Sequence, residues 1–174
     1  MIEAPLVTLI AVGNPYRRDD GVGAAVLAAV GESLGRDPRV RLAELDGEPV
    51  RMMQTWEGSS TVWIVDATSS DRRPGSLHEL DARRLGEGAG SWRGVGGGHA
   101  LGPREAIELA AGLDRLPAEI RVLGIEGETF DHGEGLTPAV AAAVPVAADR
   151  LISAIRAALT TSGATSGAAS GHSM

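Results

Sequence analysis

The stretch "PLVTLIAVGNPYRRDDGVGAAV" (residues 5–26) decides the fold, because it joins an apolar segment, a tight turn and the start of a helix. Residues 5–13 form an apolar, β-branched run that ends at Gly-Asn-Pro, which predicts a buried strand. Residues 20–34 then place valine and leucine on one helical face, with Asp20 as a candidate N-cap. The adjacent carboxylates Asp19 and Asp20 therefore lie between a strand and a helix, where folding alone rarely needs a pair of charges.

The rest of the chain repeats this alternation of apolar strands and amphipathic helices. Strands that alternate with helices predict an α/β fold, which we expect to be a single-domain three-layer α/β/α structure with a mainly parallel, twisted sheet. We expect this domain to span residues 1–159 and a disordered low-complexity tail to span 160–174. The expected strands are 40–45, 60–67, 76–81 (short, at an edge) and 118–127, and the expected helices are 49–56, 102–113 and 138–159.

Composition excludes several classes of protein. The chain has 174 residues, enough for one domain, and a net charge of −7, which argues against nucleic acid or an anionic membrane as partner. It has no cysteine, so disulfides, thiolate metal ligands and a cysteine nucleophile are excluded. Neither a run of about 18 apolar residues nor a basic segment with a signal core is present, and we expect a cytoplasmic protein.

Acidic residues follow or end four of the predicted strands. Because the carboxyl ends of parallel strands meet at one edge of a sheet, these side chains should converge, and ligands of such sheets bind there. Carboxylates that lie close together repel, so a cluster of them requires a cation or shared protons. The four residues are Asp20, Asp46, Asp66 and Glu126.

Histidines add nitrogen ligands to this set. His99 follows the glycine-rich segment 86–98 and precedes a helix, at the same predicted edge. Two carboxylates and one imidazole suit nickel, zinc, manganese or iron and leave coordination positions open. His132 lies in a loop from which it could line the site. His78 lies in the predicted edge strand and is interpreted as structural or surface, with a role as a ligand as the alternative, and His172 lies in the tail.

Three other site types fit the sequence less well. A phosphoacceptor receiver domain also has an acidic pair after its first strand, but its chemistry needs a lysine, and this chain has none. The turn 13–23 lacks the G-x-G-x-x-G spacing of a dinucleotide site, and its carboxylates would repel a pyrophosphate. The chain has no G-x-S-x-G elbow, so a serine hydrolase is disfavoured.

Several motifs resemble those of the hydrogenase maturation endopeptidases, which remove a C-terminal peptide from the large-subunit precursor of NiFe hydrogenase. The resemblance runs from about residue 7 to residue 158, and the first and last motifs are its specific parts. The motifs are "GNPYRRDDGVGAAV", "LDGEP", "IVDATSS", "GGH" and "LGIEGETFDHGEGLTPAVAAAVPVAADRLI".

The resemblance implies a phosphorylase/hydrolase-like α/β fold and a nickel site. It places Asp20, Asp66 and His99 as nickel ligands and catalytic residues, with the nickel supplied by the precursor and none tightly bound in the free protein. The nickel would position the substrate, polarise the scissile carbonyl or activate a water, in an endopeptidase of the aspartyl or metal-dependent type. Asp19 would cap or orient the turn. Substrate contacts are expected at Arg17, Arg18, Asp46, Glu126 and His132.

Two alternatives to this reading remain. A non-proteolytic nickel-binding or nickel-sensing module would keep the three ligands and cleave nothing, whereas a peptidase of another precursor would keep the opening motif with altered ligands. The segment "GGHALG" departs from the family, because alanine follows His99 where a polar residue is common. A partner that orients this imidazole would have to come from elsewhere. We expect the protein to be a monomer.

Overall fold

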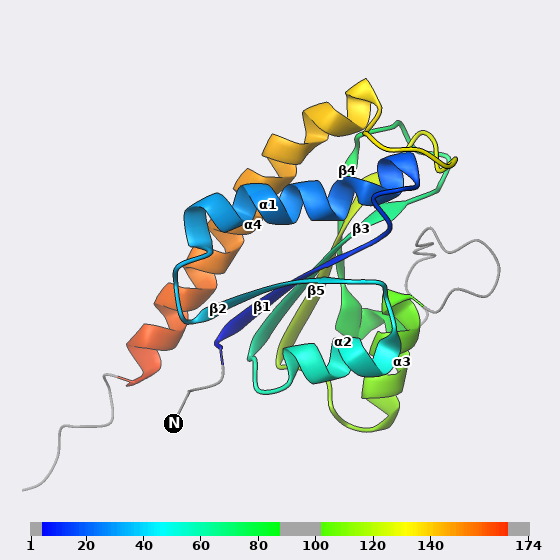
Figure 1. The fold of residues 1–174 in the computed structure, drawn as a ribbon. Coiled ribbons are helices and arrows are strands. Elements are labelled where there is room, and N and C mark those ends of the chain that lie inside the picture. Colours follow the sequence, from blue (N-terminus) through cyan, green and yellow to red (C-terminus); the bar gives the residue numbers. More distant parts are fainter. Residues whose placement is uncertain (1–4, 88–101, 167–174) are drawn as a thin grey trace, which may run out of the picture.

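A computed structural model describes residues 5–87 and 102–166 (Figure 1). Within these ranges the chain forms one sheet, four α-helices and two short 3-10 helices. The strands are β1 (Val7–Val12), β2 (Val40–Leu45), β3 (Thr61–Thr68), β4 (Leu77–Asp81) and β5 (Glu119–Glu126). The helices are η1 (Arg18–Gly21), α1 (Val22–Leu34), α2 (Pro49–Trp56), η2 (Ala82–Glu87), α3 (Pro103–Gly112) and α4 (Pro138–Ser166).

The sheet has the strand order β2-β1-β3-β5-β4. Strands β1, β2, β3 and β5 run parallel, and the short edge strand β4 pairs antiparallel with β5, so the expected mainly parallel sheet is confirmed. The four parallel strands therefore end at one edge of the sheet, which we call the carboxyl edge. Every residue of the central strands β1 and β3 is buried, as the continuous apolar runs predict.

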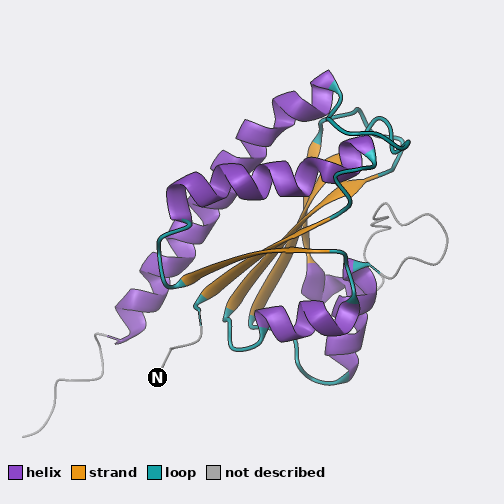
Figure 2. Ribbon diagram, viewed as in Figure 1, coloured by secondary structure: helices purple, strands orange, loops and turns teal. Residues whose placement is uncertain are grey.

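Helices cover both faces of the sheet, which confirms the three-layer α/β/α fold (Figure 2). Alternate residues of β3 show how the two cores divide, because successive side chains of a strand point to opposite faces. Trp63 and Val65 pack with α1 and α4, whereas Val62 and Ile64 pack with α2 and α3.

Helix α1 begins against the carboxyl edge because its second residue is glycine. A Cβ atom on Gly23 would lie 2.9 Å from the Val12 carbonyl oxygen and 3.0 Å from that of Val65. The helix can thus approach the ends of β1 and β3 closely, which brings the preceding turn to the carboxyl edge. The N-cap of α1 is Gly21 and makes no side-chain capping bond, so the expectation that Asp20 caps this helix was wrong.

Helix α4 continues past Leu159 to Ser166, so the first part of the expected tail is helical, and residues 167–174 lie outside the described residues. By length and composition, α4 is the one described helix that could cross a membrane, but core helices of soluble proteins pass the same test. One side of α4 supplies core residues, among them Val140, Leu151 and Ile155. This packing accounts for its apolar character.

Candidate functional site

Asp20 and Asp66 lie together at the carboxyl edge. Asp66 is near the end of β3, and Asp20 ends the turn that follows β1, the neighbouring strand. Both side chains are buried, with 5% and 4% of the residue surface exposed. The Asn14 backbone N–H donates to Asp20 Oδ2 at 3.0 Å, which closes the turn and fixes the carboxylate beside the end of β1.

Burial and mutual repulsion disfavour the ionised forms of both carboxyl groups. Loss of hydration raises the pKa of Asp66 well above its usual value, and the nearby charge of Asp20 raises it further, against a backbone hydrogen bond from Ala67. Burial also raises the pKa of Asp20, with the Asn14 hydrogen bond and the charge of Arg17 acting in the opposite direction. A cation placed between these groups would replace a proton and remove the repulsion.

Asp19 points away from this pair and has a structural role. Its fully buried carboxylate accepts hydrogen bonds from the backbone N–H groups of Glu128, Thr129 and Thr137, at 2.8, 3.1 and 2.8 Å, and from the Thr137 hydroxyl at 2.9 Å. Burial acts to raise the pKa of Asp19, but these hydrogen bonds outweigh it, so the pKa is lowered. Asp19 orients the turn, as expected, by tying it to the loop before α4.

Glu126 ends β5 at the carboxyl edge, but its carboxylate is occupied by neighbouring protein groups. It accepts hydrogen bonds from the Thr68 hydroxyl at 2.9 Å and from the backbone N–H and hydroxyl of Ser70 at 2.6 and 2.9 Å. The side chain is 1% exposed. In this arrangement Glu126 holds the segment after β3 and does not face solvent.

His78 lies in the same row of the sheet as Asp66. The strand register pairs Gly124 with Asp66 on one side and with His78 on the other. A Cβ atom on Gly124 would lie 2.5 Å from His78 Nε2, so the imidazole extends over the glycine toward β3. Among the described residues, His78 Nδ1 is the one buried side-chain nitrogen or oxygen without a hydrogen-bond partner. The sequence alone did not predict the position of His78 over Gly124, because the register between β4 and β5 cannot be read from either strand by itself.

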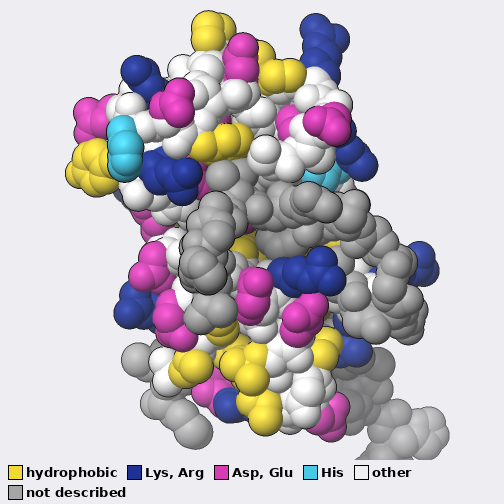
Figure 3. All heavy atoms as spheres, turned by 90° about the vertical axis from the view of Figure 1, so that its right-hand side faces the viewer, with side chains coloured by type: hydrophobic (Ala, Val, Ile, Leu, Met, Phe, Trp, Pro, Cys, Tyr) yellow, Lys and Arg dark blue, Asp and Glu magenta, His cyan; other side chains and the backbone are white. Residues whose placement is uncertain are grey.

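The remaining expected site residues are more exposed. Arg17 is half-buried, and Arg18 and His132 border a groove of about 580 Å³ between the turn before α1 and the loop before α4. Asp46 follows the edge strand β2, is exposed, and forms an ion pair with Arg51 at 3.6 Å. Figure 3 views the molecule from the side on which the parallel strands end, and acidic and basic side chains are interspersed over the described part of this face.

His99 lies outside the described residues. Within residues 5–87 and 102–166, no three histidine, aspartate or glutamate side chains are grouped so that they could hold a metal ion. Asp20 and Asp66 are two carboxylate donors, so a metal bound there would need further ligands from the segment that carries His99 or from another molecule.

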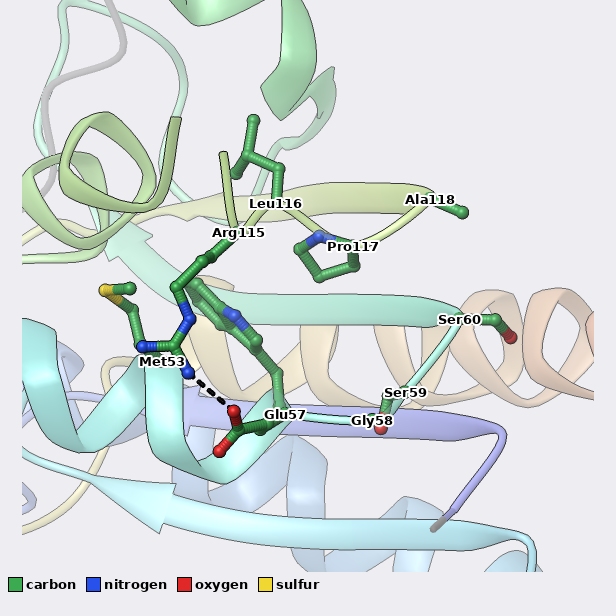
Figure 4. A pocket seen from close by; sticks show the side chains of 10 residues that line it. Met53, Glu57, Gly58, Ser59, Ser60, Arg115, Leu116, Pro117 and Ala118 are labelled. Carbon is green, nitrogen blue, oxygen red and sulfur yellow. Dashed lines mark hydrogen bonds and ion pairs between the residues drawn. The ribbon is translucent and has the colours of Figure 1, made fainter. Parts of the chain in front are cut away.

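A second pocket lies at the opposite edge of the sheet, where β3 and β5 begin (Figure 4). It has a volume of about 440 Å³, and its lining includes Ser60, Pro117 and an ion pair between Glu57 and Arg115. None of the strand-end carboxylates contributes to it.

The fold and the site define an α/β protein with a buried carboxylate pair at the carboxyl edge of its sheet. The chain belongs to the hydrogenase maturation protease family, whose HycI model matches residues 29–154. It is therefore a maturation endopeptidase, as the sequence motifs predicted. A search of the curated proteins finds no match.

Solved structures agree with this assignment. NiFe hydrogenase maturation protease HybD from Thermococcus kodakarensis is 26% identical, with a TM-score of 0.67 over 83% of this chain and 95% of that one. The hydrogenase maturating endopeptidase HybD from E. coli is 20% identical, with a TM-score of 0.69 over 86% of this chain and 91% of that one, which supports the fold.

Proposed function

We propose that this endopeptidase removes the C-terminal peptide from the large-subunit precursor of a NiFe hydrogenase after nickel insertion, and that it recognises the nickel carried by the precursor. The observation that carries the proposal is the buried pair of Asp20 and Asp66. Two adjacent carboxyl groups that resist joint ionisation are well suited to receive a cation, because the cation offsets both the lost hydration and the repulsion.

Asp20, Asp66 and His99 are the proposed ligands and catalytic residues. Two carboxylates and one imidazole match the preference of nickel for nitrogen and oxygen donors and leave positions for groups of the precursor. Bound there, the substrate's nickel would act as a Lewis acid toward the scissile carbonyl or a water molecule. The raised pKa of Asp66 favours its protonated form in the free protein, and the arriving metal would displace that proton.

Substrate contacts are proposed around this centre. Arg17 lies near Asp20, and Arg18 and His132 border the adjoining groove. Asp46, the exposed aspartate that follows β2, would contact the precursor at the periphery of this surface. Glu126 would support the substrate site through Thr68 and Ser70, since its oxygens already accept hydrogen bonds from them. We expect the protein to act as a monomer in the cytoplasm.

The test uses purified nickel-loaded and nickel-free large-subunit precursor from the same operon, with mass spectrometry of the C-terminal cleavage. We expect the wild-type chain to cleave only the nickel-loaded form. D66N should not cleave, whereas D149N, a change at an exposed aspartate of α4 that has no proposed role in the site, should retain most activity. Cleavage of both precursor forms would leave a protease without nickel recognition. Nickel-dependent binding without cleavage would favour a non-proteolytic nickel-binding module instead.

A further inference from the structure

Tyr16 is an exposed aromatic residue on a rigid turn beside the candidate site. The residue is 64% exposed, the highest value among the exposed large hydrophobic residues of the described chain, and it is the chain's one tyrosine. Folding does not account for an aromatic ring in solvent, because exposure leaves its apolar surface in contact with water. Tyrosine is enriched among the residues that dominate protein–protein binding energies.

The backbone around Tyr16 is fixed on both sides. The Tyr16 N–H donates to Asn14 Oδ1 at 2.9 Å, and its carbonyl accepts the Gly133 N–H at 2.9 Å. Arg18 N–H donates to the Gly133 carbonyl at 2.9 Å, so the turn and the loop before α4 form a short bridge. A ring presented on a braced backbone loses little conformational entropy when a partner covers it.

The position of Tyr16 relative to Asp20 limits what can cover it. The two residues are four positions apart in the sequence, and four residues span at most about 14 Å when extended. A protein–protein interface of standard size buries about 800 Å² on each partner, which corresponds to a patch of roughly 16 Å radius. An interface of that size centred on Asp20 therefore extends far enough to reach Tyr16.

We propose that Tyr16 is an aromatic anchor for the hydrogenase precursor, and that the turn 14–18 together with the bridged loop at Gly133 forms the docking surface beside the carboxylate pair. The inference rests on the proposed function, which requires a folded protein substrate to reach Asp20 and Asp66. The Tyr16 ring would pack against an apolar surface of the precursor, while Arg17 and Arg18 beside it supply hydrogen-bond donors at the rim.

The test compares Y16A with L113A in the processing of nickel-loaded precursor. Leu113 is a matched control, because it is 55% exposed and follows α3 at the opposite edge of the sheet. Y16A should raise KM at least tenfold and leave kcat and the thermal midpoint near wild-type values, whereas L113A should change neither constant. Y16F should retain most of the wild-type KM, because it keeps the aromatic surface.

The outcomes separate this inference from the proposed function. Nickel-dependent processing by the wild-type chain with an unchanged KM in Y16A would overturn the role of Tyr16 and leave the protease proposal in place. Equal increases in KM for Y16A and L113A would also overturn it, since the effect would not be specific to this surface. Direct binding of the full-length precursor, measured by calorimetry on the wild type and Y16A, tests Tyr16 even if no cleavage occurs. Equal affinities would overturn the inference.

Discussion

Asp19 and Thr137 are joined by hydrogen bonds although 118 residues separate them in the sequence. The Asp19 carboxylate accepts the Thr137 backbone N–H at 2.8 Å and its hydroxyl at 2.9 Å, and through these bonds the turn after β1 is held to the start of α4. The adjacent Asp20 makes no such long-range bonds among the described residues and lies beside Asp66. Two neighbouring aspartates thus have different roles, one structural and one proposed to bind the metal.

Replacing Asp19 by alanine should destabilise the protein strongly. The change removes the acceptor for three backbone N–H groups and one hydroxyl and leaves buried donors unsatisfied, at about 1–3 kcal/mol for each group that finds no water. We expect a loss of about 3 kcal/mol or more in the free energy of unfolding, measured by urea titration. D46N, at an exposed position, should change it by less than about 0.5 kcal/mol. Equal effects of the two variants would contradict the structural role of Asp19.

Replacing Asp66 or Asp20 by asparagine should abolish precursor processing while the thermal midpoint stays the same or rises. Each substitution keeps the side-chain shape and removes a carboxyl group that is costly to ionise in its buried position. Calorimetry of the variants and the processing assay together test this. A fall of several degrees in the midpoint would show that the carboxylate is structural.

The stability of D66N relative to wild type should increase with pH. The folded state raises the pKa of Asp66 above its unfolded value of about 3.9, so the folded state binds more protons than the unfolded state between the two values. The contribution of Asp66 to stability is therefore greatest at low pH and falls as pH rises toward the folded pKa. Urea titrations from pH 4.5 to 8 measure the difference, and a difference independent of pH would contradict the raised pKa.

Replacing His78 by leucine should cost little stability at neutral pH and should alter its pH dependence. Burial and the charge of Arg72 lower the pKa of His78, against the charge of Glu126, so the wild-type side chain destabilises the fold as pH falls below about 6.5. H78L removes this dependence and an unpartnered nitrogen. We therefore expect the free energy of unfolding of H78L, relative to that of the wild type, to increase as the pH is lowered from 7.5 to 5, measured by urea titration. H132L, at an exposed loop position, serves as the control.

Deletion of residues 167–174 should leave both the midpoint and the processing activity intact, because the described core ends within α4. Leu159 is 5% exposed and belongs to that core, so L159A should cost about 2 kcal/mol, near the lower end of the range for buried leucine. Differential scanning calorimetry of both variants measures the effects. Lost activity in the deletion, with an unchanged midpoint, would show that these residues take part in function.

Much of the fold could be predicted from local patterns. The apolar runs of β1 and β3 predicted buried strands, and the short run that contains His78 predicted an edge strand, because burial on one or two faces determines the spacing of apolar residues. The end of α4 was missed because its last turns have small residues that carry no helical periodicity and are nonetheless helical. The family motifs agreed with the fold and identified the protease class.

The sequence by itself determined the alternation of strands and helices, through the periodicity of its apolar residues. This alternation determined the mainly parallel sheet, because crossover connections between parallel strands are right-handed. The acids at the strand ends could be read directly from the sequence. Only the tertiary structure decided what each acid contacts. Asp19 and Asp20 point to different neighbours because the turn between them is fixed by a loop more than a hundred residues away. Glu126 is bound by Ser70, and His78 lies over Gly124, because strands β3, β5 and β4 are neighbours in the sheet, which no single stretch of sequence encodes.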